Sequence, residues 1–154
     1  RFVYTHVVRS RRYQRNNTFM PIVRSKSQSH DSIEVFYDEL AQSDEATSSQ
    51  IGKTMLSWIK RIEKKLPEAK IYALTSHMHL VLMPGETYIE DWAVKLIGME
   101  NHYTVQYLMP RKDSPWLNAY VTGEFTDFDE AVAMSVRAIQ LCELWPIEQL
   151  RIKN

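Results

Sequence analysis

The fold depends on the segment Lys70–Met83, which has the sequence KIYALTSHMHLVLM. Its apolar side chains recur at every second position, and this period is typical of β-strands. We expect one long strand, or two strands joined at Thr75–Ser76. One face would carry Tyr72, Leu74, Met78, Leu80 and Leu82, and the other Ile71, Ala73, His77, His79, Val81 and Met83. Because both faces are apolar, the segment is expected near the centre of a sheet.

Two helices are predicted immediately before this segment. The apolar residues of Ile51–Leu66 recur at intervals of three and four, which indicates one buried face of a helix, and Pro67 ends it. An earlier helix is expected to begin at an N-cap, Asp31 or Ser32, and to end near Gln42.

Short strands are predicted nearer the N-terminus, over Phe2–Val8 and Thr18–Val23. Pro21 lies inside the second one and has no N–H to donate to a neighbouring strand. This strand is therefore expected at an edge of the sheet.

The residues after Met83 predict a hairpin, a further strand and a last helix. The hairpin would join Trp92–Met99 to His102–Met109. The strand Trp116–Phe125 would point Leu117, Ala119, Val121, Gly123 and Phe125 inward. The helix would start at Thr126 or Asp127, where Asp127 and Glu130 provide a cap, and reach Pro146. Because the connections between successive strands are short, we predict a mainly antiparallel sheet with helices packed on one face, which is a two-layer α+β fold formed by residues 1–154 as a single domain.

The composition limits the classes of protein that the chain could belong to. Its 154 residues are 44% hydrophobic, which suffices for one core, and 19 basic residues balance 19 acidic ones. No apolar run is long enough to span a membrane, and the single cysteine, Cys142, cannot form an intramolecular disulfide. Four glycines cannot build a glycine-rich phosphate loop. We expect a soluble, cytoplasmic protein without a cofactor.

Charge is unevenly distributed along the chain. Residues 1–30 hold seven basic residues and no acidic one. Residues 27–52 have no Lys or Arg but six acidic residues, namely Asp31, Glu34, Asp38, Glu39, Asp44 and Glu45. These acids either neutralise the basic region within the fold or form a surface for a basic protein partner.

Two histidines, His77 and His79, lie two positions apart in the strand-like segment. Side chains at this spacing point to the same face of a strand and could share a metal ion. The segment resembles the paired-histidine strand of HUH nucleases, which implies a metal-dependent nucleic-acid enzyme with Arg9, Arg11, Arg12 and Arg15 on the phosphates. No tyrosine lies on the last helix, where such an enzyme would carry its nucleophile. The alternative is a pair of hydrogen-bonded structural histidines.

A longer resemblance covers residues 103–145. A strand from Tyr103 is followed by the turn Pro115-Trp116, a strand with Gly123-Glu124 and a helix that begins at Asp127. This order resembles the C-terminal half of bacterial immunity proteins encoded beside polymorphic toxins, including those of contact-dependent growth inhibition. The resemblance implies a cytoplasmic inhibitor that binds one toxin domain and has no catalytic residues.

The binding hypothesis selects two candidate patches. The first consists of the six acids of residues 27–52. The second consists of Trp116, Tyr120 and Glu124, because exposed Trp and Tyr dominate the energetics of interfaces. The alternative for the two aromatic residues is that they close one end of the sheet. Three other tryptophans, Trp58, Trp92 and Trp145, are expected in the core. A third hypothesis is a homo-oligomer in which an edge strand pairs with its own copy.

Overall fold

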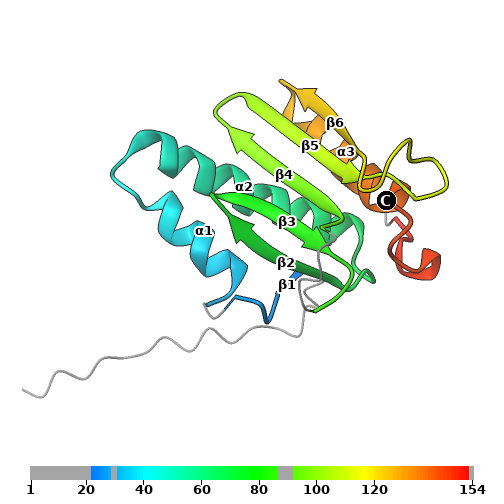
Figure 1. The fold of residues 1–154 in the computed structure, drawn as a ribbon. Coiled ribbons are helices and arrows are strands. Elements are labelled where there is room, and N and C mark those ends of the chain that lie inside the picture. Colours follow the sequence, from blue (N-terminus) through cyan, green and yellow to red (C-terminus); the bar gives the residue numbers. More distant parts are fainter. Residues whose placement is uncertain (1–21, 29–30, 87–91, 153–154) are drawn as a thin grey trace, which may run out of the picture.

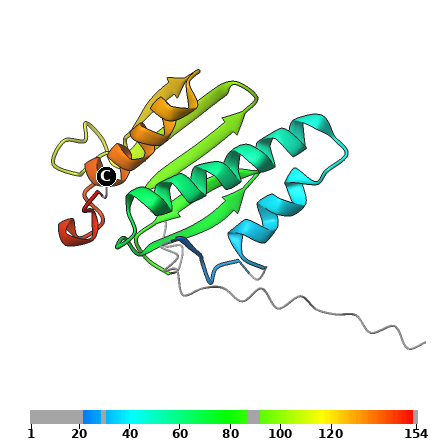
Figure 2. The same ribbon diagram turned by 180° about the vertical axis from the view of Figure 1, so that it is seen from behind.

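The computed structural model describes residues 22–28, 31–86 and 92–152, in which three helices pack on one face of a six-stranded sheet (Figures 1 and 2). The strands are β1 (Ile22–Arg24), β2 (Ile71–Ser76), β3 (His79–Met83), β4 (Val94–Met99), β5 (His102–Leu108) and β6 (Tyr120–Phe125). The helices are α1 (Ile33–Ala41), α2 (Ala46–Lys65) and α3 (Phe128–Leu141), with a short 3₁₀ turn at Ile147–Gln149. The predicted two-layer α+β fold is confirmed.

The strands lie in the sheet in chain order, from β1 to β6. All neighbours from β2 onward are antiparallel, whereas β1 pairs with β2 in parallel. The connection between β1 and β2 is the pair α1 and α2, which crosses the helical face (Figure 2). As predicted from Pro21, this first strand lies at an edge; its described part is Ile22–Arg24, and the expected residues 18–21 lie outside the described residues. The strand expected over Phe2–Val8 lies outside the described residues.

The segment Lys70–Met83 forms two strands joined by a two-residue turn at His77 and Met78, not at Thr75–Ser76. Both turn residues have positive φ angles, 49° and 69°, which suit a tight hairpin. The sequence pattern placed Ala73 and Leu82 on opposite faces of one strand. The turn instead pairs Ala73 with Leu82, so that both lie on the same side of the sheet. The buried helical side carries Ile71, Ala73, Leu80 and Leu82, and the opposite side carries Tyr72, Leu74, Val81 and Met83.

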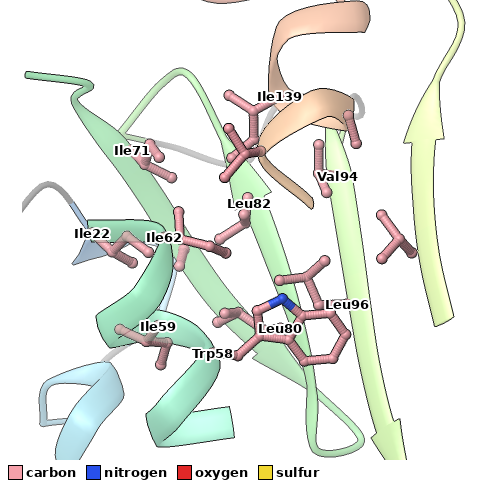
Figure 3. Close-up of a cluster of buried hydrophobic side chains, with 14 of the residues drawn as sticks. Ile22, Trp58, Ile59, Ile62, Ile71, Leu80, Leu82, Val94, Leu96 and Ile139 are labelled. Carbon is pink, nitrogen blue, oxygen red and sulfur yellow. The ribbon is translucent and has the colours of Figure 1, made fainter. Parts of the chain in front are cut away.

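The centre of the core is Trp58 on α2, which is fully buried (Figure 3). Its indole Nε1 donates to Ser135 Oγ on α3 at 2.7 Å, and that hydroxyl donates to the Ala131 carbonyl at 2.8 Å. The rings of Tyr103 and Phe128 pack against the indole edge to face. This hydrogen-bonded contact joins the two long helices above the sheet.

Helix α1 touches α2 at the level of the backbone. A Cβ atom added to Gly52 would lie 2.6 Å from the Tyr37 carbonyl oxygen and 2.7 Å from Ala41 Cα. Only a glycine allows this approach. Ser49 Oγ adds a hydrogen bond to the Ala41 carbonyl at 2.7 Å, and the buried Tyr37 hydroxyl donates to the Met78 carbonyl at 2.9 Å. Gly52 and Tyr37 therefore fix α1 against α2 and against the β2–β3 turn.

The last helix begins as predicted, with Asp127 Oδ1 accepting from the Glu130 N–H at 2.9 Å. It ends at Leu141, earlier than the predicted Pro146, and Glu143 has a positive φ of 58°. Trp145 lies beyond the helix but is buried, and its Nε1 donates to the Lys70 carbonyl at 3.0 Å. The prediction of a core position is thus confirmed for Trp58 and Trp145. Trp92, by contrast, is half-buried on the face of the sheet away from the helices.

Candidate functional site

The first candidate patch lies mainly on α1. Ser32 Oγ caps this helix by accepting from the Val35 N–H at 3.3 Å, and Ile33 and Tyr37 turn its apolar face to the core. The three- and four-residue spacing leaves Asp31, Glu34 and Asp38 along another side of the helix.

The acids of the first patch differ in solvent exposure. Glu34 is half-buried, whereas Asp31, Asp38, Glu39 and Asp44 are exposed. Asp38 Oδ2 accepts from Gln42 Nε2 at 2.8 Å. The exposed acids therefore form an acidic surface around α1 and the start of α2, and we call Asp31, Asp38, Glu39 and Asp44 the acidic surface.

Glu45 has a local structural role. Its carboxylate caps α2 and accepts from the N–H groups of Thr47 and Ser48 at 3.0 and 2.6 Å. Hydrogen bonds from the Ser48 side chain and then from the Ser48 and Thr47 backbone lower the pKa of Glu45 to about 2. The sequence reasoning missed this cap, because it assigned Glu45 to partner binding alone.

The second candidate patch is built around the loop between β5 and β6. Its ends are joined by a hydrogen bond from Met109 N to Ala119 O at 2.9 Å, and within it Ser114 Oγ donates to the Trp116 carbonyl at 2.7 Å. An ion pair from Lys112 to Glu143, at 2.8 Å, ties the loop to the end of α3. These bonds hold the loop in a defined shape.

A hollow of about 340 Å³ lies between this loop and the end of α3, and Leu108, Trp116, Leu117, Cys142 and Leu144 are among its lining residues. At its rim Trp116 is 70% exposed and Leu117 is 73% exposed. The prediction that Leu117 points inward is therefore wrong. The chain turns at Asn118, whose φ is 59°, and Ala119 N donates to Trp116 O, so that the strand begins only at Tyr120.

Exposed apolar side chains concentrate around this hollow and the neighbouring strand start. Of eleven large hydrophobic side chains exposed in the described part of the chain, six come from residues 116–121 and 144–147. They are Trp116, Leu117, Tyr120, Val121, Leu144 and Ile147. We call the first three together with Leu144 the loop surface. Leu144 and Ile147 were not predicted, although Pro146 indicated that the helix ends before it.

The other residues of the second patch lie on the sheet face away from the helices. Tyr120 packs beside Trp92, with ring centroids 5.7 Å apart, and Lys95 Nζ lies 5.0 Å from the Trp92 ring centroid. Glu124 is exposed and faces His102, with 3.9 Å between Oε2 and Nε2. Tyr120 and Glu124 share a face but occupy opposite ends of β6, so Glu124 is separate from the loop surface.

The two candidate patches do not form one surface. Helix α1 lies beside the β1–β2 side of the sheet, whereas the β5–β6 loop and β6 lie at the other side (Figure 1). Any partner that contacts the loop surface meets the acidic surface only if it spans the sheet.

The histidine pair does not have the geometry that the spacing predicted. His77 lies in the turn and His79 begins β3, so they are not neighbours on one face of a single strand. Ser76 Oγ lies 3.4 Å from His77 Nδ1. Burial, and then the charges of Lys95 and His77, lower the pKa of His79.

The nuclease hypothesis required a metal site and basic residues near the N-terminus to contact the phosphates. Among residues 22–28, 31–86 and 92–152, no group of three or more His, Cys, Asp or Glu side chains is placed to hold a metal ion. Arg9, Arg11, Arg12 and Arg15 lie outside the described residues. The structure thus removes the shared strand face on which the resemblance to HUH nucleases was based.

Cys142 is buried, as predicted from its place on the apolar side of the last helix. Its Sγ donates to the Ile139 carbonyl at 3.3 Å. Burial raises the pKa of this thiol to about 11, which keeps it protonated at neutral pH.

No protein-family model matches the chain, and neither the curated proteins nor the solved structures with which it was compared include a match. No helix in the described ranges is both long and apolar enough to cross a membrane.

Proposed function

We propose that this chain is a non-catalytic binding protein of the immunity type, which neutralises a cognate protein toxin in the cytoplasm by covering its active or substrate-binding surface. The observation that carries the proposal is the loop surface, where Trp116, Leu117 and Leu144 expose apolar side chains at a hollow and Tyr120, at the start of β6, exposes its ring on the adjoining face of the sheet. Apolar groups gathered at one surface, beside charged neighbours, are typical of a protein-binding site.

The fixed shape of the loop supports binding of a folded partner. Trp116 is held by the Ser114 hydrogen bond to its carbonyl, and the loop is tied to α3 by the Lys112–Glu143 ion pair. A surface that is already ordered loses little conformational entropy when it binds. Trp and Tyr bury a large area with few rotatable bonds, which makes Trp116 and Tyr120 the expected anchors.

The acidic surface would act at longer range. Its exposed carboxylates lie on the opposite side of the sheet from the loop surface, and they would attract a toxin with a basic surface before contact. Charges outside the contact area change mainly the rate of association and its dependence on salt.

The proposal is tested with toxin domains encoded beside this gene, using calorimetry and stopped-flow binding. We expect Trp116→Ala to weaken binding by at least about 30-fold, as for a central anchor, and Leu117→Ala by less. Met99→Ala, which trims an exposed apolar side chain at the end of β4, is the matched control and should leave the affinity unchanged.

Two further results would contradict the proposal. One is an unchanged affinity in Trp116→Ala for a toxin that the native chain binds. The other is salt-sensitive oligonucleotide binding that divalent metal strengthens, which would favour the nucleic-acid enzyme.

Reversing the charge of Asp38 and Glu39 should slow association and flatten its salt dependence.

A further inference from the structure

Within residues 22–28, 31–86 and 92–152, strand β6 forms one edge of the sheet, and its main-chain hydrogen bonds follow from its pairing with β5. Met109 N donates to Ala119 O, and β5 and β6 stay in register over the next six residue pairs. Because hydrogen-bonded and non-hydrogen-bonded pairs alternate in antiparallel strands, Val121, Gly123 and Phe125 bond to β5. The N–H and C=O groups of Tyr120, Thr122 and Glu124 therefore point away from the sheet.

The two edges of the sheet are protected differently. Strand β1 spans three of the described residues, and beyond it the Gln28 carboxamide bonds to both the N–H and the C=O of Thr75, at 3.0 and 2.6 Å. Strand β6 has six residues without Lys, Arg or Pro, its one charged residue is Glu124, and its register contains no bulge. An edge of this length, with no covering side chain, proline or bulge and a single charge, is a site for pairing with another strand.

We propose that β6 pairs with the β6 strand of a second copy of this chain, antiparallel, with Thr122 opposite its own counterpart on a two-fold axis. This proposal does not rest on the proposed function. In this register Tyr120 of each copy faces Glu124 of the other. The two Glu124 carboxylates therefore stay apart, and each lies opposite a tyrosine hydroxyl that can donate a hydrogen bond. Opposed threonines are a favourable cross-strand pair.

The helical side of β6 also fits itself in this register. Val121 would lie opposite the copy's Gly123 and diagonal to its Phe125. The Phe125 ring covers Gly123 closely, since a Cβ atom there would lie 2.9 Å from the ring. Because Gly123 has no side chain, it leaves room for the Val121 side chain of the other copy. The exposed Val121 would then be buried against the copy's Phe125.

The self-facing position of Thr122 allows a decisive charge test in the full chain. Sedimentation equilibrium from about 1 μM to about 1 mM should show a dimer of the native protein. Thr122→Lys and Thr122→Glu should each raise the dissociation constant by about tenfold or more, because like charges then face each other. An equimolar mixture of the two variants should restore the dimer.

Gln106→Lys is the matched control, because Gln106 pairs with Thr122 on the same face but in an interior strand. It should leave the dimer intact. The restored mixture also shows that both Thr122 variants are folded. The proposal is overturned if the native protein is a monomer, or if Thr122→Lys leaves the dimer unchanged. It is also overturned if the mixture stays monomeric, because Thr122 would then not face its counterpart.

Discussion

Replacing Gly52 with alanine should destabilise the protein, although alanine is the better helix former. Gly52 lies within α2, where an alanine normally stabilises by about 1 kcal/mol relative to glycine. Here its Cβ would lie 2.7 Å from Ala41 Cα and 2.6 Å from the Tyr37 carbonyl oxygen. Ordinary carbon contacts need about 3.5 Å, so α1 must move away by about 1 Å.

The size of the effect follows from these two opposing contributions. An extra methyl group in a packed site costs about 1–3 kcal/mol, and the upper end applies because both neighbours are backbone atoms that cannot rotate away. After the gain in helix propensity, the net loss in the free energy of unfolding is about 2 kcal/mol, or a fall in Tm of about 4–8 °C.

Urea unfolding followed by tryptophan fluorescence measures this loss. Ser57→Gly and Ser57→Ala, at an exposed position of the same helix, report the difference between glycine and alanine without the contact to α1. If Gly52→Ala is as stable as the native protein, or more stable, then the close approach of α1 and α2 is not rigid and the reasoning is refuted.

Three other predictions concern buried or capping groups. Ser135→Ala should lower the free energy of unfolding by about 1–3 kcal/mol in urea titrations, because the Trp58 N–H loses its buried acceptor, and a change below that range would show that the bond contributes little. The pKa of Glu45 is lowered to about 2, so its contribution to stability is present above its unfolded pKa and is lost as the pH falls toward 2. Melting curves of Glu45→Gln should therefore approach those of the native protein as the pH falls, and a constant difference would contradict the cap. The raised pKa of Cys142 and its burial predict slow alkylation by iodoacetamide in the native state and fast alkylation in urea, so rapid native labelling would show that the hollow opens.

Periodicity was enough to predict most elements of the fold. The apolar stripe from Ile51 to Leu66 predicted α2, and the Asp127 cap predicted the start of α3, because both signals depend on neighbours within one turn of a helix. The turn at His77 and Met78 was missed because neither residue is a usual turn former and both fit the alternating pattern of the segment.

The candidate surfaces depended more strongly on tertiary structure. Trp116 was correctly expected to be exposed, since Pro115 marks a turn. Leu117 was assigned to the interior because the strand was extended back past Asn118. The separation of the acidic surface from the loop surface depends on the strand order, which local sequence patterns do not encode.

The parallel pairing of β1 with β2 determines when different parts of the sheet can form. Strands β2 to β5 each pair with the next strand in the chain, through connections that are short in sequence. Residues 25–70 lie between β1 and β2, so this pairing closes a much longer loop and has a larger entropic cost. Contacts between residues far apart in sequence form slowly. We therefore expect the antiparallel strands β2 to β6 to assemble first. Helices α1 and α2 then pack on this sheet, and β1 pairs with β2 last.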